Sequence, residues 1–462
     1  MKRVSRAQRR EHFLRLAGEM FEELESWYDA HPEASFGEIE AEARQKRREL
    51  MGQALAVLIN GRDSGLGVEA PRCSQCGSPM RFHEYRSKTI RGLEGETTLE
   101  RAYYVCPRGC GETFSPLDQT LRLRNDAWSD GAAQVAAEQG LQSRSFDRSA
   151  CSFTRAVGAE ISGDSVRRIT EGWGQQVEQA RAAEVEQVFA LGHGGDTDSA
   201  AVVEKVCPLG ERGNLSTDGH LIPIRGEGWK EVKLSVISAV EVRAVDDASP
   251  SGGRRDASGV HLYAHSCQAG LWDADTMGQY QYVEGLRRGL ESCQHLSSVN
   301  DAAAWIERIT AENYPQAVQI VDWSHAVGHL WSVAQAVFGV GDPRSQGWVD
   351  VQKEVLWQGQ AVQVSQAIGA LPSSAQEVTA AQGYFEGHQD QMHYDRYRAA
   401  GYPIGSGTVE SGGKNYVQYR LKRPGRGWDR DKAQSMLAAL SEMHSDRFNY
   451  AWEHFAQPTN LR

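Results

Sequence analysis

Three acidic residues that lie far apart in the sequence, Asp218, Asp301 and Glu410, are of a type that binds hard divalent cations. Asp218 falls within the strand-like segment GNLSTDGHLIPIRG, and Asp301 follows the short apolar stretch LSSVN. Three converging carboxylates repel one another unless cations lie between them. We therefore expect them to hold two Mg²⁺ or Mn²⁺ ions, which activate an attacking hydroxyl and stabilise the leaving oxygen of a phosphodiester. The alternative for each single aspartate is a cap or turn residue.

A strongly basic segment follows Glu410. If this segment is helical, Glu410, Lys414 and Val417 lie along one face, so Lys414 can meet a phosphate beside the scissile one. We expect four further cations to follow the DNA backbone: Arg420, Lys422, Arg423 and Arg426. The alternative is a solvated helix end whose cations interact favourably with the helix dipole.

Four grouped cysteines have the spacing of metal ligands. Two residues separate Cys73 from Cys76, and three separate Cys106 from Cys110. The segment between the two pairs reads as a β-hairpin, so the unit resembles a zinc ribbon with one structural Zn²⁺. A closed shell of four thiolates leaves no open position for chemistry. The scattered cysteines are expected to be small buried apolar residues: Cys151, Cys207, Cys267 and Cys293.

Helical patterns surround this ribbon. Between residues 6 and 30, apolar residues recur at helical spacing: Phe13, Leu16, Met20, Phe21, Leu24 and Trp27. A second helix is expected over about 37–60. The segment FTRAVGAEISGDSVRRITEGWG predicts a helix, a turn at Gly158 and a second helix capped by Ser162. This pattern is typical of a helix-turn-helix whose Arg167 and Arg168 contact DNA, and equally of a plain helical hairpin.

Residues 205–330 predict the element order β-β-β-α-β-α-β. Three strands in a meander followed by strand–helix units favour a mixed sheet that helices cover. Asp218 lies inside the first strand and Asp301 at the carboxyl end of the fourth, so both can face one crevice. Glu410 can reach this crevice from a helix packed over the sheet. Residues 330–400 are mostly helical and carry no recognisable chemistry.

Composition and net charge limit the classes of partner that the chain can be expected to bind. The 462 residues suffice for about two to four domains, and 40% of them are hydrophobic. The formal net charge of −11 argues only weakly against nucleic acid as a partner, because binding depends on local basic clusters. No apolar run approaches the roughly 20 residues of a membrane span. The basic start MKRVSRAQRR lacks the apolar core of a secretory signal, so we expect a cytoplasmic protein with no membrane partner.

Several segments resemble bacterial insertion-sequence transposases of the Kra-type group, which is allied to the Mutator superfamily. The resemblance covers about residues 70–430 and is carried by STDGHLIPIRGEGWKEVK, NDAAAWIERI, IVDWSHAVGHL and PIGSGTVESGGKNYVQYRLKRPGRGW. It implies a DDE catalytic triad of Asp218, Asp301 and Glu410 on a ribonuclease H-like fold. The family's second aspartate usually lies in a Gly-Asp-Gly-Ala context, which is Asn300-Asp301-Ala302-Ala303 in this chain. This departure bears on whether the chain is active.

The resemblance also points to an auxiliary pair, Asp322 and His325, with the family's Asp-x-x-His spacing. The chemistry of the two residues does not decide whether the pair positions the scissile strand or a nearby base. Asp322 also ends an apolar strand, so it rivals Asp301 as the second metal ligand. We prefer Asp301 because it ends the fourth strand, where the ribonuclease H-like pattern places the second aspartate.

Together these features predict a multidomain α/β protein. The expected parts are an N-terminal helical region (1–65), a zinc ribbon (66–120), a helical DNA-binding region (121–190), the first part of a ribonuclease H-like core (191–330), a helical insertion (331–400) and the C-terminal part of the core with Glu410 and the basic tail (401–462).

The resemblance implies an enzyme that cleaves DNA at the ends of an insertion sequence and joins the freed 3′-hydroxyl to target DNA. Its partners would be the double-stranded DNA of the element ends and target, and further copies of the chain in a homodimer or higher assembly. The location would be the nucleoid-associated bacterial cytoplasm. The alternative is a catalytically inactive zinc-ribbon DNA-binding protein derived from a transposase, which the altered surroundings of Asp301 and the acidic net charge favour. A nuclease without strand transfer would use the same site.

Overall fold

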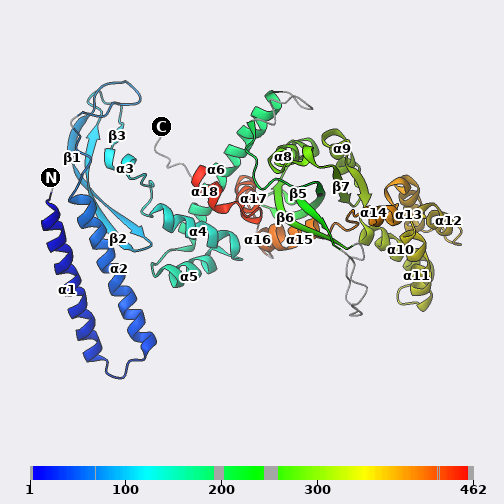
Figure 1. The fold of residues 1–462 in the computed structure, drawn as a ribbon, viewed down its shortest axis with the longest axis horizontal. Coiled ribbons are helices and arrows are strands. Elements are labelled where there is room, and N and C mark those ends of the chain that lie inside the picture. The colour runs from blue at the N-terminus through cyan, green and yellow to red at the C-terminus, as the bar shows by residue number, and fades with distance from the viewer. Residues whose placement is uncertain are drawn as a thin grey trace. The chain divides into compact units, whose positions relative to one another are not determined.

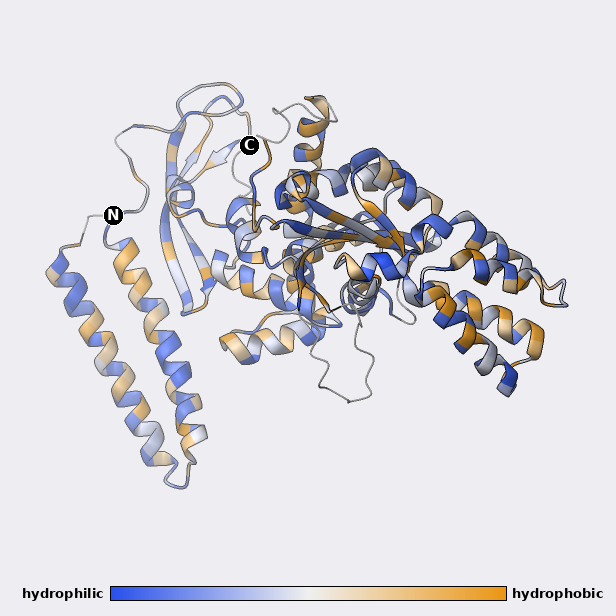
Figure 2. Ribbon diagram, turned by 45° about the vertical axis from the view of Figure 1, so that its right-hand side comes forward, coloured by the Kyte–Doolittle hydropathy of each residue, from blue (hydrophilic) through white to orange (hydrophobic). Residues whose placement is uncertain are grey.

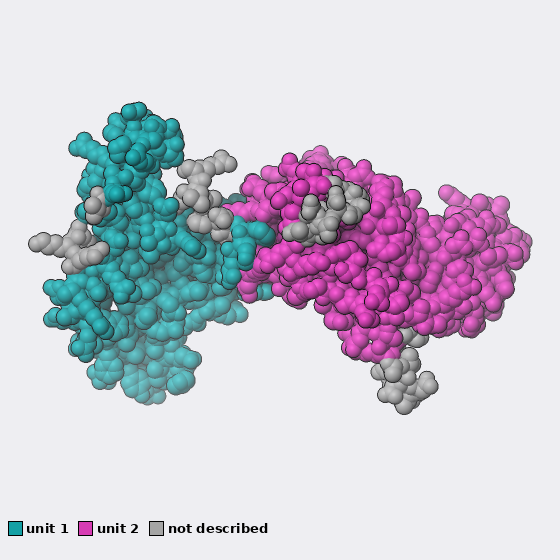
Figure 3. Space-filling model, turned by 45° about the horizontal axis from the view of Figure 1, so that its top comes forward, with its two compact units in different colours: residues 1–173, 452–462 teal, residues 174–451 magenta. Residues whose placement is uncertain are grey.

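The computed structural model describes residues 4–67, 69–191, 202–243, 259–423, 425 and 427–455 of the chain. The chain divides into two compact units, residues 1–173 with 452–462 and residues 174–451 (Figure 3). Both units combine helices with a sheet, as expected for a multidomain α/β protein. In the described residues, no helix is long and apolar enough to cross a lipid bilayer.

The first unit opens with a hairpin of two long helices, α1 (Arg6–Ala30) and α2 (Phe36–Asn60) (Figure 1). Each helix begins with a capping box, which satisfies backbone N–H groups at the helix start. Four residues of the predicted α1 stripe are partly buried: Leu16, Met20, Leu24 and Trp27. Phe13 and Phe21, which the stripe included, are instead 38% and 60% exposed. No residue of α1 is fully buried.

A three-stranded antiparallel sheet follows, with the order β1 (Arg81–Gly92), β2 (Gly95–Val105) and β3 (Thr113–Phe114). The predicted hairpin between the two cysteine pairs is therefore present. Its strands are long because turn residues lie only at the tip, between Gly92 and Gly95.

Four helices complete the part of the chain before the second sheet: α3 (Pro116–Thr120), α4 (Asp130–Gln142), α5 (Phe146–Val157) and α6 (Gly163–Ala190). α5 ends at Gly158, whose φ of +78° is the left-handed conformation that closes a helix. The Ser162 hydroxyl accepts the backbone N–H of Ser165 at 3.1 Å at the start of α6. The predicted helix, glycine turn and capped helix are thus confirmed as local structure.

The second unit contains a five-stranded mixed sheet with the order β6-β5-β4-β7-β8. Its strands are β4 (Arg212–Ile224), β5 (Gly228–Val242), β6 (Val260–Gly270), β7 (His295–Asn300) and β8 (Val318–Val321). The first three pair antiparallel, whereas β7 runs parallel to β4 and β8 runs parallel to β7. α8 (Ala274–Arg288) and α9 (Ala304–Asn313) connect the later strands, so the predicted order of elements is confirmed.

Residues after β8 form the predicted helical region. It consists of α10 (Trp323–Phe338), α11 (Pro343–Trp357), α12 (Ala361–Gly369), α13 (Gln376–Gly387) and α14 (Tyr394–Ala399). These helices share one apolar core that continues to Val299 of β7 and Ile320 of β8. The helical region therefore packs against β7 and β8, the two parallel strands at one side of the sheet.

The segment around Glu410 is helical from 407 to 421, as expected, but a π turn interrupts its α-helical hydrogen bonding. It consists of α15 (Gly407–Gly412), one π-helical turn η3 (Gly413–Gln418) and α16 (Tyr419–Leu421), before α17 (Arg430–His444) and α18 (Phe448–Phe455). The π turn lies directly on β4, because a Cβ at Gly413 would fall 1.9 Å from Nε2 of His220. Turns of this kind are frequent at functional sites.

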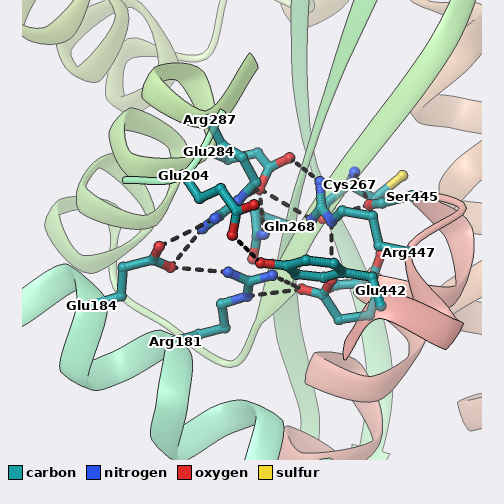
Figure 4. Close-up of polar contacts among 12 residues, drawn as sticks. Arg181, Glu184, Glu204, Cys267, Gln268, Glu284, Arg287, Glu442, Ser445 and Arg447 are labelled. Atoms are coloured by element: carbon teal, nitrogen blue, oxygen red, sulfur yellow. Dashed lines mark hydrogen bonds and ion pairs between the residues drawn. The ribbon is translucent and has the colours of Figure 1, made fainter. Parts of the chain in front are cut away.

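A buried network of charges joins α6, α8 and α17 within the second unit (Figure 4). Glu284 of α8 is 1% exposed and lies 2.6 Å from Arg447 and 3.2 Å from Arg287. Glu442 completes the network with Arg447 at 3.0 Å and Arg181 at 2.7 Å. Burial acts to raise the pKa of Glu284, but Arg447 and Arg287 outweigh it and hold the pKa well below its usual range. Because every carboxylate here has an arginine partner, the network is a structural support.

Candidate active site

Asp218 lies in the middle of β4, opposite Leu234 of β5. Its Oδ1 accepts the N–H of Gly219 at 2.7 Å, and its Oδ2 lies 3.6 Å from His220 Nε2. Burial raises the pKa of Asp218 above its usual value, and the carboxylates of Asp301 and Glu410 act in the same direction. The three acidic side chains are therefore close enough to interact electrostatically, although they come from three distant segments.

Asp301 follows β7, the strand that runs parallel to β4. Its Oδ1 accepts the N–H of Ala303 at 3.0 Å, which forms a tight turn into α9. Ala302 within this turn has a φ of +66°, in the left-handed region that favours glycine. The turn thus explains physically why a glycine would suit the position after the aspartate, and why the alanine is strained.

Glu410 reaches the sheet from α15, which contacts both β4 and β5. Its side chain is 46% exposed and lies 3.8 Å from Lys414 Nζ. The oxygen atoms of Asp218, Asp301 and Glu410 do not all lie within 4.8 Å of one another, a condition that only the four grouped cysteines meet in the described part of the chain. The three carboxylates therefore do not form a site for a single metal ion in this structure.

Asp322, the rival ligand, is 2% exposed and uses both carboxylate oxygens. One oxygen accepts the N–H of His325 at 2.6 Å and caps α10, and the other accepts the N–H of Ser406 at 2.7 Å. Ser406 immediately precedes α15, which carries Glu410. Asp322 therefore fixes the start of α15, the helix that carries Glu410. Because both carboxylate oxygens of Asp322 are already engaged, this geometry favours Asp301 over Asp322 as the predicted metal ligand.

An aromatic and imidazole cluster beside Asp301 was missed by the sequence analysis. The Tyr384 hydroxyl donates to the main-chain oxygen of Asp301 at 3.3 Å, and its ring stacks on His329 at 4.1 Å between centroids. His325 lies 5.2 Å from His329 between ring centroids. Burial lowers the pKa of His329, and the neighbouring His325 and His388 act in the same direction. The sequence does contain a pattern that could have revealed this cluster. His325 and His329 are four residues apart, as are Tyr384 and His388, so each pair lies on one face of a helix.

A hollow of about 760 Å³ lies beside the helix that carries Glu410. Cationic and aromatic side chains line it together, among them Trp229, Lys414, Tyr419, Lys422 and Arg423. Trp229 is 57% exposed, and Lys422 Nζ lies 5.4 Å from its ring centroid. The sequence analysis missed Trp229, which sits at the start of β5 after a tight turn.

The basic residues predicted to follow DNA are not all on the surface. Arg420 is 3% exposed and lies over the Trp428 ring, so the prediction that it contacts DNA is wrong. It is buried because α16 turns its side chain inward, whereas Lys422 lies just after the helix and is exposed. Arg426 lies outside the described residues.

Arg167 and Arg168 of α6 are engaged within their own helix. Arg167 pairs with Asp164 at 2.6 Å and with Glu171 at 2.9 Å. Arg168 lies 3.2 Å from the same Asp164. Phosphate contacts by these arginines would compete with the intrahelical ion pairs, so their role in DNA binding stays a prediction.

Four cysteines form the clearest metal site in the described residues. The Sγ atoms of Cys73, Cys76, Cys106 and Cys110 lie within 4.8 Å of one another, so the cluster can bind a structural metal such as zinc. A backbone N–H of Ser78 lowers the pKa of Cys76 to about 6, whereas Glu112 raises the pKa of Cys73 to about 12, so in the absence of a metal Cys76 is the thiol of this pair that ionises more readily.

The scattered cysteines only partly match the expectation. Cys267 and Cys293 are buried, but Cys151 and Cys207 are exposed, so the prediction is wrong for these two. Their surroundings depend on how helices and loops pack, which no local pattern encodes.

No family model matches the chain, and no curated protein matches it significantly.

Proposed function

We propose that the chain is a DDE transposase of a bacterial insertion sequence, with a ribonuclease H-like catalytic core in residues 191–330 and 401–462 and a helical insertion between them. The observation that carries the proposal is the placement of the three carboxylates on adjoining elements: Asp218 lies within β4, Asp301 follows the adjacent parallel strand β7, and Glu410 lies on α15, which contacts β4 and β5. The sheet supports it, because three antiparallel strands followed by two parallel ones place Asp218 within β4 and Asp301 just beyond the adjacent β7. Ligands collect at such strand ends in mixed α/β sheets.

Asp218, Asp301 and Glu410 would hold two Mg²⁺ or Mn²⁺ ions, which supply the activation of the attacking hydroxyl and the stabilisation of the leaving oxygen. Water attacks the phosphorus at the element end and the P–O3′ bond breaks, which leaves a free 3′-hydroxyl. That hydroxyl then attacks a phosphorus of target DNA, and the displaced 3′-oxygen of the target takes up a proton. Lys414 neutralises the neighbouring phosphate, and Lys422 and Arg423 bind the backbone further along.

Asp322 acts as a positioning residue in this proposal, because it fixes the residue before α15 without offering a free oxygen. The zinc ribbon and the helices up to residue 190 would recognise the element ends. Double-stranded DNA and further copies of the chain are the proposed partners, and the bacterial nucleoid is the proposed location.

The second candidate is a DNA-binding protein that has lost catalysis. The strained Ala302 next to Asp301 favours it, because a misplaced second carboxylate weakens metal binding. A nuclease that cleaves DNA without strand transfer would use the same site.

Cleavage and joining of labelled element-end DNA in the presence of Mg²⁺ tests the proposal. Glu410→Gln should abolish both reactions while DNA binding persists, and Glu377→Gln, an exposed carboxylate on α13, serves as the matched control. Cleavage without joining would indicate a nuclease. DNA binding without any cleavage by the unaltered chain would support the second candidate.

A further inference from the structure

The exposed face of α1 carries an apolar seam with charged ends. Leu14, Phe21 and Tyr28 are 55%, 60% and 51% exposed and recur every seven residues. Figure 2 shows hydrophobic and hydrophilic stretches alternating along α1, the long helix beside the N-terminus. Arg10 precedes this series and Glu25 lies within its second half, and both side chains are exposed. At 3.6 residues per turn, these five residues fall within a sector about 60° wide. We call them the α1 seam.

The α1 seam is separate from the side of α1 that packs on α2. Leu16, Met20, Leu24 and Trp27 cover that inner side, about 100° away around the helix. Among the described residues, Arg10 and Glu25 have no ion-pair partner, whereas nearby Arg15 pairs with Glu19 at 2.5 Å. The apolar residues and the charges of the α1 seam are therefore both left without partners within the chain.

Charge is distributed unevenly along α1. The first half carries most of its arginines, and the second half carries most of its acidic residues. A parallel pair of such helices would place arginine against arginine and glutamate against glutamate. An antiparallel pair instead places opposite charges together and also aligns the helix dipoles favourably.

We propose that a second copy of this chain packs antiparallel on the α1 seam around a twofold axis near Gly18. In this arrangement Leu14 faces the second copy's Phe21, and Arg10 faces its Glu25, on both sides of the axis. Gly18 lies at the crossing, and nothing lies within 4 Å of a Cβ built there, so the two backbones can approach closely. The proposal does not depend on DNA or on the proposed catalytic site.

The seam is short for a stable interface, so the dimer is weak, with a dissociation constant of about 1–100 µM. Sedimentation velocity of the full chain across that range, without DNA, should show a monomer–dimer equilibrium. Phe21→Glu should weaken dimerisation at least about 10-fold, because it places carboxylates in the apolar centre. Phe36→Glu, which changes an aromatic residue that is 79% exposed and off the α1 seam, should leave it unchanged.

A charge exchange tests the orientation. Arg10→Glu should weaken dimerisation because it sets two carboxylates together at each end of the seam, and adding Glu25→Arg should restore it. Circular dichroism checks that every variant keeps its helices. The proposal is overturned if the chain stays monomeric up to about 100 µM, or if neither Phe21→Glu nor the charge exchange changes the dissociation constant of the dimer.

Discussion

The carboxylate of Asp322 accepts the backbone N–H of Ser406 at 2.7 Å across 84 residues of sequence. This hydrogen bond joins the end of β8 to the residue before α15, and the Trp323 N–H reinforces it by donating to the Ile404 oxygen at 2.9 Å. The start of the helix that carries Glu410 is thus fixed by the buried side chain of Asp322, whose two oxygens both accept backbone N–H groups.

Asp322→Asn should destabilise the fold by about 2–4 kcal/mol, because an amide NH₂ would meet one of the two N–H donors in a buried place. Urea unfolding measures the loss. Asp342→Asn is the matched control: Asp342 caps α11 from the surface, and asparagine caps as well as aspartate, so stability should hardly change. Equal effects of both substitutions would contradict the positioning role.

Ala302→Gly should stabilise the chain by about 1 kcal/mol, because it relieves a left-handed alanine at φ +66°. Ala303, at φ −67°, is the N-cap of α9, where glycine is preferred over alanine; this preference offsets the added freedom of the unfolded chain, so Ala303→Gly should change stability little. Thermal unfolding of the two variants compares them directly. A loss of stability in Ala302→Gly would show that the turn is not strained.

Glu284→Gln should cost about 3–5 kcal/mol at pH 7, because it removes one of the two carboxylates that pair with the buried Arg447 and leaves an excess of buried positive charge. A carboxylate whose pKa is depressed by folding stabilises the fold above its unfolded pKa of about 4.3, and this contribution is lost as the pH falls. The unaltered chain should therefore lose stability below about pH 4.3, with a shallower pH dependence in Glu284→Gln. Denaturant titrations at several pH values check this, with exposed Glu186→Gln as the control.

One zinc ion per chain should be found by elemental analysis, and Cys106→Ser should remove it together with part of the stability of the β1–β2 hairpin. Cys151→Ser changes an exposed cysteine outside the cluster and should keep the metal. Retention of zinc by Cys106→Ser would argue against the four-cysteine site.

Trp229→Ala should weaken DNA binding about 10-fold if a nucleobase stacks on the exposed indole beside Lys422. Tyr263→Ala removes another exposed aromatic residue, 46% exposed on β6, and should have little effect. Fluorescence anisotropy with a labelled oligonucleotide measures both, without Mg²⁺ so that cleavage does not interfere. Equal affinities of the two variants would rule out a specific role for Trp229.

The sequence by itself determined the features that depend on local spacing. The spacing of the four cysteines predicted their cluster, because two short turns bring each pair of thiols together. Periodicity predicted the order of helices and strands and the turn at Gly158, since these follow from neighbours a few residues apart.

Only the tertiary structure decided which of the basic residues after Glu410 face solvent and which aspartate at a strand end is already engaged. Arg420 is buried while Lys422, two residues later, lines the hollow, because Arg420 lies within α16 and Lys422 follows the end of that helix. Asp322 and Asp301 both end apolar strands, yet one oxygen of Asp322 accepts the N–H of His325 nearby and the other accepts that of Ser406, 84 residues away. Such outcomes depend on packing between distant segments, which side-chain type and local periodicity do not encode.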